Sequence, residues 1–492
     1  MRPTRLAISF ALGVSLITFN WTMATEPQRM PNVLWIMLDD GRADALSCYG
    51  KAWAKTPHMD AIAAAGVRFE TAIVQNPVCT PSRTCIKTGL YAHQTGVMAM
   101  GKPTSVQGNY QNRIRPSSDQ YNLLQAWSRH GSTPMNIGKM HVFQEGWNQL
   151  ASFQPLLNHN GKPTSLFKET WQGTILSQVK TKTHDWLIGG VVDVPVTEFR
   201  QSRIGDFAVD KLKHLTVKDE PFFLRVSFHA PHVACYISPS HLIAPETIDL
   251  PFPTPEELDQ KPQFEQQNLH VYSGAPDLDR DQIQLARATY YGMVSLVDDQ
   301  VGRLMTVLRE SGKLQNTIVV INSDQGFQLG EHGLWKKRDF YDTNVCIPWI
   351  IQAPARLPAG KVVEEPVESI DFLPTLMDLC GMVPPDNIPG RSLLPLLEGK
   401  DDSWPEACFS EHDHSQDMYD ELRDGGGRRV MVRTKEWKLV FFMDERLPHQ
   451  DPALYHLRHD PYEQHNLAVH SKYGSKVQEL KQLATIWDQS TN

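Results

Sequence analysis

Three apolar segments of the chain each end in a group of polar side chains. Residues 32–38 read NVLWIML, and largely apolar runs also occupy 221–228 and 317–321. Such runs are typical of strands buried on both faces, as in a parallel sheet covered by helices. Open α/β sheets form their sites beyond the carboxyl ends of such strands. The sequence therefore predicts an α/β fold with a functional site at one edge of a large sheet.

Carboxylate and amide side chains follow two of these strands. Asp39 and Asp40 come after the first, and Asp324 and Gln325 after the third. Adjacent buried carboxylates repel each other unless a cation or a proton lies between them. Oxygen ligands suit Ca²⁺ or Mg²⁺, whereas Zn²⁺ favours His and Cys ligands at metal spacing. A solvated acidic turn is an equal alternative for Asp39-Asp40 on these grounds alone.

The stretch 79–89, CTPSRTCIKTG, predicts a helix that begins near Cys79. Pro81 suits a first helical turn, and Gly89 suits the residue that ends a helix. The free N–H groups and dipole of a helix N-terminus favour anions there. Arg83, one turn on, has a planar fork of donors for an oxyanion. The alternative interpretation is a buried cysteine and an arginine in a surface salt bridge.

Two further pairs of basic side chains are candidates for the same site. Lys139 and His141 are two residues apart on a segment expected to be extended, so both would point the same way and bind one anion. His229 and His232 follow the strand 221–228. Taken alone, these histidines are equally consistent with metal ligands, catalytic acids or structural side chains.

The remaining pattern predicts one large domain and a smaller one after it. Helical periodicity marks the segments 56–65, 203–215, 286–308 and 477–487, and residues 240–282 read as a long surface excursion. After about residue 399 the alternation in 429–434 and 437–442 is typical of antiparallel strands. We expect a catalytic domain over 25–398 and a C-terminal subdomain of sheet and helix over 399–492.

The first 24 residues predict a cleaved signal peptide. Arg2 and Arg5 precede an apolar run over 6–19, and Thr22 and Ala24 are small residues before a cleavage point. An uncleaved anchor is the alternative, but the run is shorter than the ~20 residues that span a bilayer. No later segment is long and apolar enough to do so. We therefore expect export, to a periplasm or outside the cell, or to a lysosome in a eukaryote.

Composition adds two exclusions. The seven cysteines in 492 residues are too few, and odd in number, for a disulfide scaffold. A formal net charge of −8 argues against nucleic acid as the partner. Neither observation excludes an anionic small molecule, because local charge matters more than the total.

A series of motifs resembles the type I sulfatases. The likeness is nearest to the branch of iduronate-2-sulfatase and the bacterial polysaccharide sulfatases. In chain order the motifs are Asp39-Asp40, CYG (48–50), TP-x-x-D (56–60), GVRF (66–69), NPVCTPSR (76–83), GKMH (138–141), HAPH (229–232), SDQG (323–326), GEHGLWKK (330–337) and LYHLRHDPYEQHNLA (454–468).

The resemblance implies a fold, a modified residue and a cation. The fold would be the alkaline-phosphatase-like sandwich, with a mostly parallel sheet between helices and a smaller C-terminal subdomain. A maturation enzyme would oxidise Cys79 to formylglycine, whose hydrated aldehyde is the nucleophile. The ligands of a Ca²⁺ ion, or second a Mg²⁺ ion, would be Asp39, Asp40, Asp324, Gln325 and the residue derived from Cys79. The family usually has Asn or His where Gln325 stands.

The resemblance also assigns roles around the sulfate group. Arg83, Lys139, His141 and Lys337 would hold its oxygens, and His232 would protonate the departing alcohol. The implied activity is hydrolysis of sulfate esters, on a sulfated carbohydrate similar to a glycosaminoglycan. The alternative is a phosphodiester or phosphonate monoester hydrolase of the same fold. No role follows for His229 or Lys336.

Overall fold

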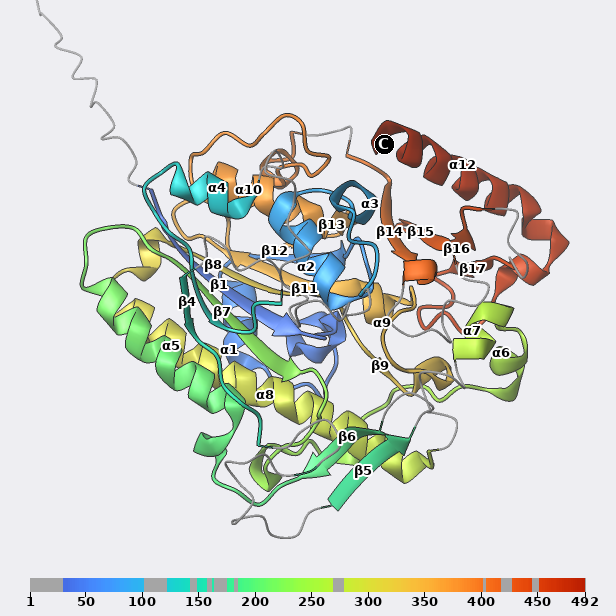
Figure 1. Ribbon diagram of the computed structural model, residues 1–492, viewed down its shortest axis with the longest axis horizontal. Helices are drawn as coiled ribbons and strands as arrows, with labels where there is room; N and C mark the ends of the chain where they lie inside the picture. Colours follow the sequence, from blue (N-terminus) through green and yellow to red (C-terminus); the bar gives the residue numbers. More distant parts are fainter. Residues whose placement is uncertain are drawn as a thin grey trace, which may run out of the picture. The chain divides into compact units, whose positions relative to one another are not determined.

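Strand β1 (Asn32–Asp39) lies inside the large sheet of the computed structural model (Figure 1). The structure describes residues 30–100, 122–141, 148–156, 162, 175–180, 185–268, 278–400, 404–416, 427–444 and 451–491. Within these residues the sheet has nine strands in the order β12-β2-β11-β8-β1-β7-β3-β4, with β13 also paired to β2. The other strands of this sheet are β2 (Val67–Ile73), β3 (Met135–Gly138), β4 (Asn148–Ala151), β7 (Phe223–Pro231), β8 (Thr317–Ser323), β11 (Cys346–Gln352), β12 (Lys361–Val363) and β13 (Val367–Glu368).

The sheet is mostly parallel. Strand β1 pairs in parallel with β7 and β8, and β7 pairs in parallel with β3. Only β11 runs antiparallel to its neighbours β2 and β8. The carboxyl ends of β1, β7 and β8 therefore meet at one edge, as the three apolar runs predicted.

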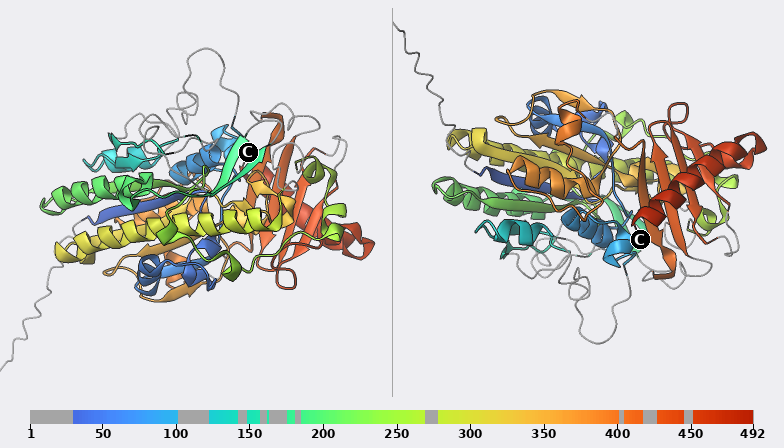
Figure 2. Two further views of the ribbon diagram at one scale, coloured as in Figure 1. Left: turned by 90° about the horizontal axis from the view of Figure 1, so that it is seen from below. Right: turned by 90° about the horizontal axis from the view of Figure 1, so that it is seen from above.

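Both faces of β1 are buried, which explains why its sequence is apolar without alternation. Leu34, Ile36 and Leu38 belong to a core shared with α1 (Pro57–Ala64), α5 (Arg200–Thr216) and α8 (Arg280–Glu310). On the opposite face Trp35 packs against Phe372 of α10 (Phe372–Leu379), with ring centroids 4.5 Å apart. Figure 2 shows helices on both sides of the sheet.

The remaining elements are further helices and two small hairpins. The helices are α2 (Cys79–Thr88), α3 (Ala92–Thr95), α4 (Leu123–Ser128), α6 (Pro255–Asp259), α7 (Gln263–Asn268), α9 (Asp342–Val345), α11 (Leu394–Leu397) and α12 (Gly474–Thr491). Two hairpins join β5 (Ile175–Lys180) to β6 (Asp185–Val191) and β9 (Gln328–Leu329) to β10 (Trp335–Lys336).

A second, antiparallel sheet forms the C-terminal part of the molecule, drawn in orange and red in Figure 1. Its strands are β14 (Ala407–Asp413), β15 (Arg428–Thr434), β16 (Trp437–Phe442) and β17 (Ala453–His456), paired in that order, and α12 packs on β15 and β16. The amide nitrogen of Asn76, in the segment before α2, donates to the carbonyl of Glu411 on β14 at 2.7 Å. This contact ties the second sheet to the large one.

The expected fold class is confirmed, with corrections to three elements. Helix α8 begins at Arg280 rather than near 286, because Asp279 and Gln282 form a reciprocal cap. Strand β7 continues to Pro231, so His229 lies within the strand and only His232 follows it. Part of the expected excursion 240–282 is helical, as α6 and α7.

Two predictions about the organisation of the chain stay predictions. Residues 1–24, the expected signal peptide, lie outside the described residues, and the boundary at 398/399 is not tested by the architecture. Across the part of the chain that the structure describes, no helix has the length and apolarity to span a bilayer.

One buried carboxyl at the junction of the two sheets gives a testable pH dependence. Glu368 accepts hydrogen bonds from the Tyr91 hydroxyl at 2.6 Å and from the Phe409 backbone at 2.8 Å. Burial, with the nearby Asp371 carboxyl, raises the pKa of Glu368 to about 8. The folded state therefore favours the protonated acid, and its stabilising contribution is lost as pH rises from about 4.5 through 8.

We expect Glu368→Gln, which is neutral at every pH, to gain melting temperature relative to the wild type as pH rises. The gap should widen by roughly 2 °C between pH 5 and pH 8.5 in thermal scans. Glu364→Gln is the control, because that side chain is exposed and pairs only with Lys435 among the described residues. A gap that is constant with pH would contradict the assignment of a raised pKa to Glu368.

Candidate active site

Helix α2 places Cys79 at its first residue, as the sequence predicted. Val78 before it is extended, and Gly89 after it adopts a left-handed conformation with φ 71°. That conformation suits glycine and closes the last turn through a bond from its N–H to the Cys85 carbonyl at 2.9 Å. Cys79 is 1% exposed. Its sulfur thus lies at the positive end of a buried helix.

Lys337 is the ammonium group beside this cysteine. Its Nζ lies 3.7 Å from Cys79 Sγ and 2.7 Å from Asp40 Oδ1. Burial alone would lower the pKa of Lys337, but Asp40 and Cys79 raise it well above its usual value. Lys336 instead lies over the Trp186 ring, with Nζ 3.7 Å from the centroid. Of the two lysines, only Lys337 is placed to act at residue 79.

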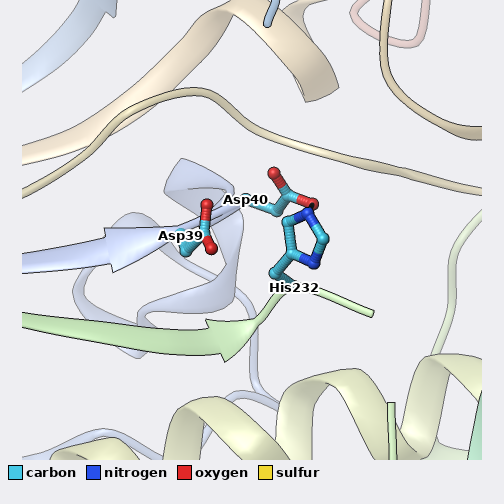
Figure 3. Close-up of side chains that lie close together, drawn as sticks. All are labelled: Asp39, Asp40 and His232. Carbon is cyan, nitrogen blue, oxygen red and sulfur yellow. Dashed lines mark ion pairs between the residues drawn. The ribbon is translucent and has the colours of Figure 1, made fainter. Parts of the chain in front are cut away.

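Asp39, Asp40 and His232 form an acidic cluster at the edge of the sheet (Figure 3). The aspartates come from the end of β1 and the histidine from the end of β7, so parallel pairing of the two strands brings them together. One ligand atom from each lies within 4.8 Å of the others. Asp40 has φ 64°, a left-handed conformation that turns its carboxylate away from the direction of the strand.

Three buried oxygens around this cluster have no hydrogen-bond donor among the described residues. They are Asp39 Oδ1, Asp40 Oδ2 and Gln325 Oε1. The Gln325 amide nitrogen donates to Asp40 Oδ1, which leaves the amide oxygen as the unpaired atom. Buried acceptors without a partner are costly, and a hard cation satisfies several of them at once. The residues present therefore fit Ca²⁺ or Mg²⁺.

Asp324 and Arg83 form a buried ion pair next to these oxygens. Arg83 Nε donates to Asp324 Oδ2 at 2.6 Å, and Arg83 Nη1 donates to Ser227 Oγ at 3.1 Å. Asp324 Oδ1 accepts the backbone N–H groups of Asp40 and Gln325, each at 3.0 Å. The fork expected to face an oxyanion is thus largely occupied, because buried carboxylates compete for its donors. Among the described residues, Nη2 has no hydrogen-bond acceptor, and it lies 3.4 Å from Asp39 Oδ1.

The two adjacent aspartates differ in their tendency to hold a proton. Burial tends to raise the pKa of Asp39, but Lys139, His232 and Arg83 together hold it well below the usual range. For Asp40, burial outweighs Lys337, and the pKa rises to about 7. A cation among these oxygens would favour both ionised forms, since an opposite charge lowers a carboxyl pKa.

Lys139 and His141 both reach this site, but from a loop. Strand β3 ends at Gly138, so the extended segment expected to carry them is shorter than predicted. Lys139 Nζ lies 2.5 Å from Asp39 Oδ2. His141 Nδ1 lies 3.4 Å from the hydroxyl of Thr80, the residue after Cys79. Burial, then the charges of Lys139 and Arg83, lower the pKa of His141 well below its usual value.

The backbone of the next residue orients the His232 ring. Its Nδ1 lies 2.6 Å from the Val233 carbonyl, which fixes Nδ1 as the donor and directs Nε2 toward Asp40 Oδ2 at 3.8 Å. Burial lowers the pKa of His232 well below its usual value. His229 lies further back on β7, and its Nδ1 is buried without a hydrogen bond to any described residue. The geometry therefore favours His232 over His229 as the histidine of the site.

Three residues of the site were not identified from the sequence. Tyr290 of α8 donates its hydroxyl to the Asp40 carbonyl at 2.6 Å and accepts the Arg42 N–H at 3.0 Å. Arg225 of β7 donates to the Lys139 carbonyl at 2.8 Å. Ser82 donates to the Asp324 carbonyl. Tyr290 lies in the segment 286–308, for which the sequence predicts only a helix, and no local pattern distinguishes the other two.

Two family models match the chain. The model described as "Sulfatase" covers residues 31–382, and that described as "N-sulphoglucosamine sulphohydrolase, C-terminal" covers 330–489. Together they include every candidate site residue named above, from Asp39 to Lys337.

Curated relatives and a solved structure agree with this match. An arylsulfatase of Clostridium perfringens is 27% identical over 92% of this chain and 93% of its own. An N-acetylglucosamine-6-O-sulfatase of Bacteroides thetaiotaomicron is 27% identical over 93% of this chain and 86% of its own. Human iduronate 2-sulfatase is 27% identical over 77% of this chain and 68% of its own. A phosphonate monoester hydrolase from Silicibacter pomeroyi superposes with a TM-score of 0.76 over 94% of this chain and 96% of its own, at 22% identity. The last likeness shows the fold alone.

The Tyr290 hydroxyl gives a test of the cation site. Without it, the left-handed Asp40 loses the hydrogen bond that fixes its carbonyl, so we expect Tyr290→Phe to bind Ca²⁺ about tenfold more weakly in calorimetric titration. Tyr291→Phe is the matched control on the same helix, because none of the described hydrogen bonds joins Tyr291 to the Asp40 loop. Equal Ca²⁺ affinity of the two variants would contradict a positioning role for Tyr290.

Proposed function

Since this chain belongs to the sulfatase family and is therefore a sulfuric ester hydrolase, we propose that its substrate is a sulfated carbohydrate, attacked by a formylglycine at position 79 beside one divalent cation. One observation carries the mechanistic part. The side chain of residue 79, the Lys337 ammonium and three unpaired buried oxygens meet where β1, β7 and β8 end.

The proposed formylglycine would supply the nucleophile, and the proposed cation would supply a strong positive charge. Oxidation of Cys79 by a maturation enzyme would supply an aldehyde hydrate, a nucleophile that Cys itself cannot provide. Asp39, Asp40, Asp324, Gln325 and the modified residue 79 would hold Ca²⁺, with Mg²⁺ second, and such a cation polarises sulfate oxygens.

The basic side chains would stabilise the charge on the sulfate group. Lys337 lies at hydrogen-bonding range of residue 79, and Lys139 approaches from the loop after β3. The Nη2 of Arg83 and the ring of His141 complete the set of donors near Cys79. Donors that are fixed before the reaction stabilise developing negative charge more than mobile solvent does. The burial of Cys79 and Arg83 strengthens these interactions.

His232 would donate the proton that the leaving alcohol needs. Its Nδ1 is committed to the Val233 carbonyl, so the proton must be delivered from Nε2. Burial keeps the ring neutral in the resting protein. It would gain the proton as the active site fills with the anionic ester, because a nearby negative charge raises a histidine pKa.

The carbohydrate part of the proposal is supported by the names of two relatives. Two relatives carry a sugar in their names, N-acetylglucosamine and iduronate. We also propose export through residues 1–24, which would expose the enzyme to polysaccharides outside the cytoplasm.

The second candidate, a phosphonate monoester or phosphodiester hydrolase, is kept because of the structural likeness with TM-score 0.76. A sulfate monoester carries one negative charge, whereas a phosphate monoester carries nearly two at neutral pH, because its second pKa is about 6. One cation with Arg83, Lys139 and Lys337 matches the singly charged ester. Phosphodiesters are also singly charged, so some activity on them is expected.

The modification of residue 79 can be read directly. Peptide mass spectrometry of the active enzyme should show the aldehyde in place of the Cys79 thiol. Cys79→Ala should release no sulfate, with little loss of melting temperature, because the thiol makes only two weak contacts to described residues, Lys337 and Met100. Cys48→Ala serves as the control variant. Fully active protein that contains only the thiol would refute the mechanism.

The reaction class is tested by matched substrates. We expect the kcat/KM of the matured enzyme for an aryl sulfate to exceed that for the corresponding aryl phosphate and phosphodiester by about 100-fold or more, roughly 3 kcal/mol of transition-state preference. Release of sulfate from sulfated glycans should follow in the same preparation. A phosphoester preferred over every sulfate would move the chain to the second candidate.

A further inference from the structure

A group of basic side chains lies on one face of the C-terminal sheet. His412 and Arg429 are directly paired across β14 and β15, so they project to the same face, and His414 follows His412 by two residues. They are 0%, 3% and 1% exposed, respectively. The rings of His412 and His414 are 4.6 Å apart, and His414 packs on Phe264 with centroids 4.2 Å apart. We call these three residues, with Arg338, the basic cluster.

The basic cluster contains polar atoms that need a partner. Both ring nitrogens of His414 and Nη1 of Arg429 are buried without a hydrogen-bond partner in the described chain. Burial, the neighbouring imidazole and the charges of Arg429 and Arg338 lower the pKa of His414 well below its usual value. A buried donor left unpaired costs as much as a lost hydrogen bond, so such atoms usually mark a bound group or water.

The charge of the basic cluster favours an anion over water. Arg429 has one ion-pair partner among the described residues, Glu265 at 3.1 Å. That carboxylate is shared, because it also accepts the Tyr341 hydroxyl at 2.6 Å and lies 3.9 Å from the Lys261 ammonium. The charged groups that act on the His414 ring, Arg429 and Arg338, are both positive. An anion that accepted from Arg429 would also favour the protonated imidazole, with its two donors.

The basic cluster is connected to the candidate active site at two points. His412 Nδ1 lies 3.4 Å from the amide oxygen of Asn76, which precedes Cys79 by three residues. Arg338 directly follows Lys337, whose ammonium contacts Cys79. The cluster is no more enclosed than Cys79 and Arg83 themselves, which are 1% and 0% exposed and must meet the ester. These connections place the basic cluster next to the segments that carry Cys79 and Lys337.

We propose that the basic cluster of His412, His414, Arg429 and Arg338 is a second anion subsite, which binds an acidic group of the saccharide whose sulfate ester is cleaved. The inference rests on the proposed function and extends it from a sulfated sugar to a sugar with at least two acidic groups. A uronate carboxylate and a second sulfate both match the donors, since each accepts planar or forked hydrogen bonds from Arg and imidazolium. The C-terminal sheet thereby takes part in substrate selection.

The test compares substrates that differ only in the second acidic group. The panel is a sulfated N-acetylhexosamine, the same sugar with a second sulfate, and the same sugar linked to a uronic acid. The wild type should show at least tenfold higher kcat/KM for one diacid than for the monosulfate, mainly through a lower KM. The reason is that the monosulfate lacks the second acidic group and so cannot form the charge-assisted hydrogen bond with the basic cluster. Whichever diacid is preferred identifies the group that the cluster binds.

His414→Phe is the test variant, because the ring lies among aromatic side chains and a phenyl ring keeps its volume. It should lower the ratio of kcat/KM for diacid over monosulfate about tenfold. His456→Phe on β17 is the matched control, with the same change in the same sheet on the Trp437 ring, 4.3 Å away. It should leave the ratio as in the wild type. A purely structural effect of His414→Phe would lower both values and leave the ratio unchanged.

Each failure has its own signature. A wild type without preference for either diacid, or a ratio that His414→Phe does not move, would overturn the subsite and indicate a buried water instead. If no sulfate is released from any member of the panel, the proposed function fails. The subsite is then tested by ligand binding. The measurement is the increase in melting temperature that an unsulfated uronate disaccharide gives to the wild type. Equal stabilisation of His414→Phe, or none in either protein, would overturn it.

Discussion

The buried ion pair between Arg83 and Asp324 is the interaction on which the site depends. It joins the helix that carries residue 79 to the end of β8, and through Ser227 and Asp39 it reaches β7 and β1 as well. Desolvation makes a buried pair a weak source of net stability, whereas removal of one partner costs about 3–5 kcal/mol. Its value is therefore geometric. It fixes where Cys79 lies relative to the three strand ends.

The uneven distribution of positive charge explains why the carboxyl groups around this pair differ in pKa. The carboxylates of Asp39, Asp40 and Asp324 are opposed by Arg83, Lys139 and Lys337, but the distribution is uneven. Asp39 has most of the positive neighbours and stays ionised, whereas burial brings Asp40 to a pKa of about 7. The protein thus has one position where more positive charge is needed, and three unpaired oxygens surround that position. This imbalance is the physical argument for the proposed cation.

The sequence predicted what local pattern determines and missed what long-range packing determines. The three strand ends and the helix at Cys79 were recognisable because apolar runs, Pro81 and Gly89 carry local signals. Lys337 could be separated from Lys336 only by position in a motif, and the structure supplies the physical reason, since Trp186 covers one and Asp40 attracts the other. Tyr290 and Arg225 could not be found, because their partners are 250 and 86 residues away in the chain.

Gln325 shows how a departure from the family pattern is accommodated. The family usually has Asn or His at this position, and Gln is one methylene longer than Asn. In the structure the longer side chain lets its nitrogen donate to Asp40 Oδ1, while its oxygen stays buried and without a donor. That hydrogen bond places the amide nitrogen against the Asp40 carboxylate and so distinguishes the two ends of the amide. Because the Tyr290 hydroxyl donates to the Asp40 carbonyl, helix α8 helps to position the residue that Gln325 contacts. The unpaired amide oxygen is the type of atom that the proposed cation site needs.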